Sequence, residues 1–169
     1  TALTGPGLAS FDTAYQWWMA RHMEISTLWP PAYVFSFRLL DGALPGLAAP
    51  TAWFVINLSL TSIGAALVAL RCTRSVVGAM ACYFALVASP VAWLLLPHVW
   101  SDVALVSMLL VAVGCLVAAE TSGASGLVRR IYLAASFVGL FFFFFVRHNA
   151  IVAVVPLAVL WCALAMPEM

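Results

Sequence analysis

The sequence has very little charge and contains no lysine. Only 8% of its 169 residues are charged, against about 25% in an ordinary soluble domain. Its net charge of +1 comes from seven arginines and six acids. With 66% hydrophobic residues and a mean hydropathy of +1.11, the chain has too few charges to cover its apolar surface in water. The composition predicts an integral membrane protein. It excludes intrinsic disorder, a nucleic-acid binder and a secreted disulfide scaffold.

Closely spaced cysteines are also missing. Most of the four lie inside apolar runs, where a cysteine usually serves as a small hydrophobe. Neither a disulfide framework nor a metal site is predicted, and no cofactor, although a divalent cation stays open. The scattered cysteines are Cys72, Cys82, Cys115 and Cys162. The start shows no signal-peptide pattern. Because the chain begins at Thr1, we expect a preceding segment that includes a transmembrane helix.

Long apolar runs predict about five membrane-spanning helices. A bilayer core of about 30 Å needs roughly 20 apolar residues in helical form, and only helices satisfy their own backbone groups in lipid. Pro90 is expected to kink the second span. The fourth span is the shortest and contains five consecutive phenylalanines, some of which must face lipid. The predicted spans cover residues 51–70, 75–96, 102–119, 131–146 and 151–166.

Arginines between the spans predict the orientation. Arg71 and Arg74 follow the first span, and Arg129 with Arg130 precedes the fourth, so both pairs must face the same side. The positive-inside rule assigns that side to the cytoplasm. The amino-terminal segment, the turn before Asp102 and the turn after residue 146 then face the extracytoplasmic side. A functional site would be assembled there.

Residues 1–50 form a separate predicted unit, an extracytoplasmic segment with short interfacial helices, and residues 51–169 form the transmembrane bundle. A helix is expected from Asp12 to about residue 26, because aromatic residues such as Tyr15 and Trp18 recur at helical spacing and indoles favour the headgroup level. The pair Pro30 and Pro31 breaks this helix. A short apolar run over residues 32–40 follows, in which Arg38 is expected to pair with Asp41. The fold class is therefore an all-α polytopic membrane helix bundle.

This layout resembles the GT-C superfamily of membrane glycosyltransferases, which use polyprenyl-phosphate-linked sugars. The closest branch contains the protein O-mannosyltransferases and the aminoarabinose transferases. The resemblance covers residues 8–165. It depends on three short motifs: an acid in an aromatic interfacial helix (Asp12 to Met19), the helix break at Trp29-Pro30-Pro31, and a second acid in Trp100-Ser101-Asp102. Thr13 stands where many relatives carry a second acid, and Trp29 where a histidine is usual. The resemblance implies a fragment or a reduced homologue.

The resemblance implies a role for each matched residue. Asp12 would be the catalytic base, and Asp102 a second acid that either orients the acceptor or binds a cation. Arg147 and His148 would bind the donor phosphate, since guanidinium groups match phosphate oxygens. An interfacial acceptor segment would comprise Tyr15, Trp18, Trp29, Pro30 and Pro31. The partners implied are the lipid bilayer and a polyprenyl-phosphate sugar, in a multi-pass protein of a bacterial inner membrane.

Structural roles explain the same residues without catalysis. Asp12 and Asp102 each fit the first turn of a helix, where an acid complements the helix dipole. Arg147 and His148 end a span, where cations are favourable. Three functions therefore stay open: a glycosyltransferase, a non-catalytic membrane subunit or scaffold, and a transporter. The transporter ranks last because no predicted span carries an ionisable residue near its middle.

The polar and small residues of the spans are expected to serve helix packing. Asn57 and Thr61 lie in the first predicted span, and Gly78 and Gly114 in later ones. Small residues allow close approach of two helix backbones, and hydroxyl or amide groups bond across the contact.

Overall fold

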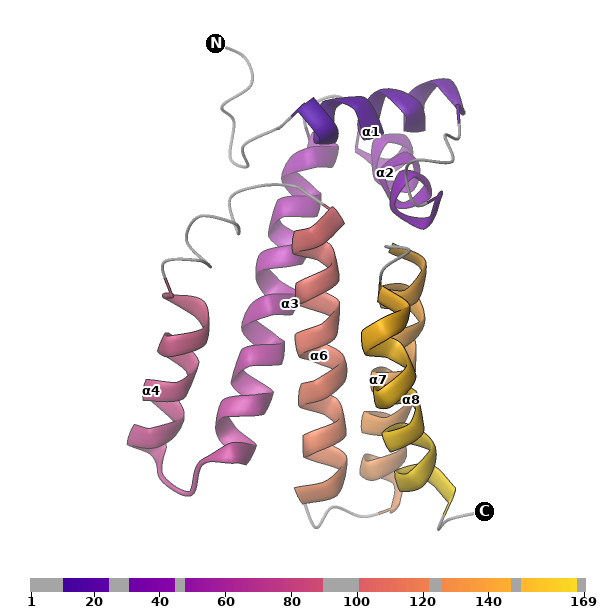
Figure 1. Cartoon of the computed structure of the whole chain (residues 1–169). Helices are drawn as coiled ribbons and strands as arrows, with labels where there is room; N and C mark the ends of the chain where they lie inside the picture. Colours follow the sequence, from indigo (N-terminus) through magenta and orange to yellow (C-terminus); the bar gives the residue numbers. More distant parts are fainter. Residues whose placement is uncertain are drawn as a thin grey trace.

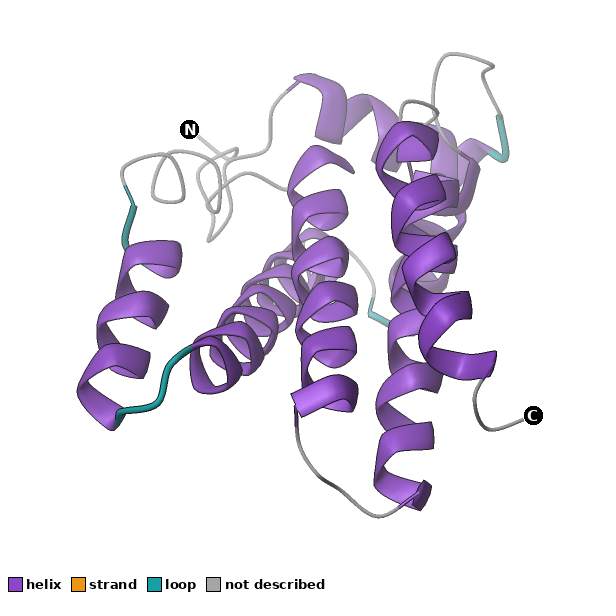
Figure 2. Cartoon of the chain, turned by 60° about the horizontal axis from the view of Figure 1, so that its bottom comes forward, coloured by secondary structure: helices purple, strands orange, loops and turns teal. Residues whose placement is uncertain are grey.

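The computed structural model describes residues 11–24, 31–44, 48–89, 101–121, 126–146 and 150–166. Within these ranges the chain forms seven helices and no strand, as Figure 2 shows. The predicted all-α class is confirmed for this part of the chain.

Three helices are long and apolar enough to cross a membrane. They are α3 (Ala48–Cys72), α6 (Ser101–Thr121) and α7 (Gly126–Val146), of 25, 21 and 21 residues. At about 1.5 Å of rise per residue, each covers a hydrocarbon core of about 30 Å. The shorter apolar helices are α4 (Val76–Val87) and α8 (Ile151–Ala165). These lengths support a multi-pass membrane protein.

Two span boundaries differ from the sequence prediction. The helix expected to continue through Pro90 ends at Val87, where the backbone N–H of Ala88 closes the last turn on the carbonyl of Phe84. The residue before a proline disfavours helical backbone, so the chain leaves the helix before that point. The fourth span starts at Gly126, earlier than expected, and takes Arg129 and Arg130 into its first turns.

The helices stand side by side, with α6 between α3 and α7 (Figure 1). Helix α4 packs beside α3, and α8 beside α7. Two short helices, α1 (Phe11–His22) and α2 (Pro31–Ala43), lie across one end of this bundle. The α3–α4 turn, with Arg74, and the start of α7 lie at the other end, so the two arginine pairs share an end as predicted.

Glycines bring α6 close to both of its neighbours. A Cβ atom added to Gly64 would stand 2.5 Å from the backbone carbon of Leu110, and one on Gly114 would stand 2.8 Å from Cβ of Leu67. Gly139 of α7 faces Ala112 of α6 in the same manner. The predicted packing role of Gly114 is confirmed, because only a hydrogen fits there.

Gly78 has a different role from the one predicted. It lies in the first turn of α4, and its N–H donates to the side-chain oxygen of Ser75, which caps that helix. A Cβ atom on Gly78 would meet only Ser75 and Thr73 of its own segment, so this glycine makes no close contact with another helix.

A hydrogen bond joins α3 to α6 inside the bundle. The side-chain oxygens of Thr61 and Ser107 lie 2.8 Å apart, and Ser107 also donates to the carbonyl of Val103. Because a hydroxyl has one hydrogen, Thr61 is the donor between the two helices. The packing role predicted for Thr61 is confirmed. Asn57, one turn away, is buried, and neither atom of its amide has a hydrogen-bond partner.

Helix α8 has no fully buried residue, but its apolar side chains pack on Leu116 and Leu133, and two polar contacts add to this packing. The indole N–H of Trp161 donates to the carbonyl of Leu133 at 2.8 Å, and Arg129 donates to the carbonyl of Leu164 at 2.7 Å. The second bond satisfies a carbonyl in the last turn of α8, where a cation is favourable. Of the five consecutive phenylalanines in α7, Phe143 is buried and the other four are exposed, as the lipid-facing prediction requires.

Candidate functional site at the capped end of the bundle

Helices α1 and α2 cover the bundle end through one apolar cluster. Met19 of α1 and Tyr33 and Phe37 of α2 pack with Trp53 at the start of α3 and Val146 at the end of α7. Ala104, in the first turns of α6, completes the contact. The cap therefore brings together α1, the start of α6 and the end of α7, the elements on which the predicted catalytic residues were placed.

Tyr33 is the centre of this cluster. Its side chain is fully buried, stacked on Trp53 with ring centroids 5.4 Å apart and in edge contact with Phe37 at 5.2 Å. Burial raises the pKa of the Tyr33 phenol well above its usual range, and the negative charge of Asp102 raises it further. The phenol therefore stays protonated.

Asp102 lies in the first turn of α6, beneath the cap. Its side chain is exposed, whereas Ser101 and Val103 on either side are buried. The carboxylate is therefore reachable from solvent, and its negative charge acts on the buried phenol of Tyr33. Such a position suits an acid that orients a polar ligand.

The other residues proposed for chemistry are described less completely. Asp12 lies in the first turn of α1, but its side chain is outside what the structure describes. Arg147 and His148 lie outside the described residues, directly after Val146, which packs in the capping cluster. Trp29 and Pro30 also lie outside the described residues. Their roles stay predictions.

The aromatic residues predicted to form an acceptor segment lie on the outer face of α1. Trp18 stacks between Tyr15 and His22, with centroid distances of 5.8 and 4.5 Å. His22 donates from Nδ1 to the carbonyl of Trp18. All three side chains are exposed, so this row faces away from the capping cluster. Pro31, predicted with them, is exposed at the first position of α2, where a missing N–H costs nothing.

The predicted pairing of Arg38 with Asp41 is wrong. Asp41 accepts three hydrogen bonds of 3.0 to 3.2 Å from Arg21 of α1 and a fourth, of 2.9 Å, from the indole of Trp17. The Arg21 side chain also lies over the Trp17 ring, 4.5 Å from its centroid. Arg21 holds the pKa of the Asp41 carboxyl below its usual range. Local spacing favoured a pair within α2, but the α1–α2 contact provides two donors at once.

Several polar groups near the cap are buried without a hydrogen-bond partner. They are the side-chain oxygen of Gln16 on α1 and the indole N–H of Trp53 on α3, besides the Asn57 amide. Trp53, Asn57 and Thr61 follow one another at four-residue spacing on α3, so they share one face of the helix. Across the described ranges, no group of three His, Cys, Asp or Glu residues could hold a metal ion.

Comparisons with known proteins give no match to this chain among protein-family models, curated proteins or solved structures. The functional interpretation therefore depends on the residues themselves.

Proposed function

We propose that the chain is a membrane glycosyltransferase, similar to the GT-C superfamily, that uses a polyprenyl-phosphate sugar as donor. The observation that supports it best is the charge of Asp102 acting on the buried phenol of Tyr33, beneath a cap formed by α1 and α2. The first-turn position of Asp102 alone would also suit a scaffold, whereas an exposed acid whose charge acts on a buried phenol beneath the cap favours the enzyme.

The side of the membrane follows from the arginines. The capped end lies opposite the end that carries Arg74 and Arg129 (Figure 1). With arginine-rich loops in the cytoplasm, the cap faces the extracytoplasmic side of a bacterial inner membrane. In this proposal α4 and α8 complete the five spans. Residues 1–50 form the extracytoplasmic segment.

The proposed reaction transfers a sugar to an acceptor hydroxyl. Asp12 removes the hydroxyl proton while the acceptor oxygen attacks the anomeric carbon of the donor. The bond from that carbon to the phosphate oxygen breaks, and polyprenyl phosphate leaves with the electron pair. Arg147 and His148 stabilise the leaving phosphate, and Asp102 orients the acceptor.

A transfer assay in membranes tests the proposal. The longest natural version of the chain would be supplied with radiolabelled polyprenyl-phosphate sugars, and wild type compared with Asp12→Asn and Asp102→Asn. Glu24→Gln is the matched control, because this acid of the same cap closely follows α1 and is exposed. We expect label transfer in wild type and in the control, and losses of at least 100-fold in the other two variants.

The assay also separates the competing functions. Equal transfer by Asp12→Asn would remove that residue from the chemistry. If wild type is correctly inserted and transfers label from no donor, the chain is better explained as a non-catalytic membrane subunit.

A further inference from the structure

Helix α2 carries large apolar side chains on the face that no other helix covers. Phe35 is 47% exposed and Leu39 is 76% exposed, whereas Tyr33 and Phe37 on the opposite face are buried in the capping cluster. A helix with one buried face normally presents polar side chains on the other. The outer face of α2 is therefore suited to apolar surroundings.

The position of α2 indicates what those surroundings are. It lies between α1 and the ends of the long helices, and it packs against α1, α3 and α7 (Figure 1). Tyr33 and Phe37 of α2 pack on Trp53 at the start of α3 and on Val146 at the end of α7, two helices long enough to cross a membrane. Helix α2 therefore lies at the level where these spans end, which is the level of the membrane surface.

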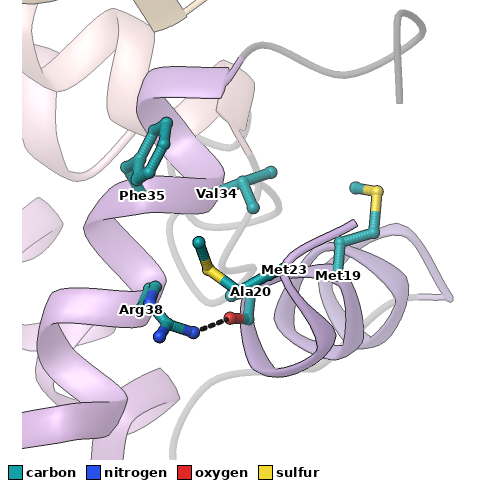
Figure 3. Close-up of a pocket in the computed structure, with 6 residues that line it drawn as sticks. All are labelled: Met19, Ala20, Met23, Val34, Phe35 and Arg38. Carbon is teal, nitrogen blue, oxygen red and sulfur yellow. Dashed lines mark hydrogen bonds between the residues drawn. The ribbon is translucent and has the colours of Figure 1, made fainter. Parts of the chain in front are cut away.

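The groove between α1 and α2 is too small for a ligand. Met19, Met23, Val34 and Phe35 line it with Arg38 at its edge (Figure 3), and its cavity of about 10 Å³ holds at most one water molecule. A partner of this region must therefore bind on its surface.

Arg38 provides a cation on this apolar face. Its guanidinium is exposed and donates one hydrogen bond, to the carbonyl of Ala20 at 3.2 Å (Figure 3). In the described part of the chain, Asp41 forms its salt bridge with Arg21, and no acid forms one with Arg38. The other N–H groups of Arg38 lie in the plane of its guanidinium group, and their spacing matches two oxygens of a phosphate.

We infer that α2 lies in the membrane surface, with Phe35 and Leu39 among the acyl chains and Arg38 bound to the phosphate of an anionic phospholipid. An anionic headgroup such as phosphatidylglycerol is favoured over phosphatidylcholine, whose choline already compensates its phosphate. One arginine at an anionic surface corresponds to about a fivefold preference. This site does not depend on the proposed transferase activity.

Photo-crosslinking from position 39 tests the inference. The full chain, with p-benzoylphenylalanine in place of Leu39, is reconstituted in phosphatidylcholine vesicles in which about one lipid in ten is phosphatidylglycerol. Mass spectrometry of the irradiated protein identifies the attached lipid. We expect phosphatidylglycerol adducts at about five times their share of the bilayer. Arg38→Gln should return the ratio to that share, and Arg38→Lys should retain most of the enrichment.

A second probe position controls for general lipid contact. Val152, at the start of α8, is highly exposed and lies at the same end of the bundle. Its lipid adducts should not respond to Arg38→Gln. The inference is overturned if position 39 yields no lipid adduct, if it captures another protein chain instead, or if its phosphatidylglycerol share is the same in wild type and Arg38→Gln.

Discussion

Replacing Gly64 by alanine should separate α3 from α6. The added Cβ atom would lie 2.5 Å from the backbone carbon of Leu110 and 2.6 Å from the nitrogen of Val111, whereas ordinary contact begins at 3.4 Å. Backbone atoms cannot rotate away, so the two helices must move apart locally by about 1 Å. Overpacking of this kind costs about 1–3 kcal/mol.

The same displacement should break the hydrogen bond between Thr61 and Ser107. Its length of 2.8 Å would grow beyond the range of a hydrogen bond. Loss of such a hydrogen bond between membrane helices lowers the free energy of unfolding by about 0.6 kcal/mol, whereas the higher helix propensity of alanine raises it by about 1 kcal/mol. The net loss in the free energy of unfolding should be about 1–2 kcal/mol.

Unfolding by SDS in mixed micelles, followed by circular dichroism, measures this loss. Gly126→Ala is the matched control, because a Cβ atom there meets nothing within 4 Å. In a double-mutant cycle, Thr61→Ala should destabilise wild type and have little further effect in Gly64→Ala. Equal stability of the Gly64→Ala and Gly126→Ala proteins would refute the close-contact reasoning.

Three further predictions concern the cap, α8 and α7. Because the pKa of Asp41 is lowered in the folded state, its ionised carboxylate stabilises the cap above the ordinary pKa range of a carboxyl group, and this stabilisation is lost as the pH falls through the lowered pKa. Tryptophan fluorescence should therefore report loosening of the cap below about pH 4, and Asp41→Asn should abolish that transition. Trp161→Phe removes a hydrogen bond to α7, so hydrogen exchange in α8 should rise by about threefold to tenfold while α6 is unchanged. Phe143→Ala should cost about 3 kcal/mol of unfolding free energy and Phe142→Ala less than about 1 kcal/mol, because only the first is buried; equal costs would contradict the orientation of α7.

The sequence predicted the helical class and the arrangement of the ends because those depend on runs of apolar residues and on arginine positions. It also placed Thr61 and Gly114 at helix contacts, since small and hydroxyl residues have few other roles inside lipid. Helix α4 ends at Val87, before the predicted end of the second span, and the predicted kink at Pro90 lies outside the described residues.

The details of the cap could not be read from local spacing. Asp41 bonds to Arg21, twenty residues away, although Arg38 is nearer in sequence, because the packing of α1 on α2 decides the partner. Tyr33 was not singled out, since an aromatic residue in a surface helix is usually an interfacial anchor. Its burial against Trp53 depends on how α2 lies on the bundle, which hydrophobic periodicity does not specify.

The close contact of α3 with α6 imposes an order on membrane insertion. Helices α3 and α4 are synthesised before α6, whereas Ser107, which accepts the hydrogen bond from Thr61, belongs to α6. During that interval the polar face of α3 has no helix opposite it, and α4 packs on a different side. Thr61 therefore gains its hydrogen-bond partner on another helix only after α6 is synthesised and docks.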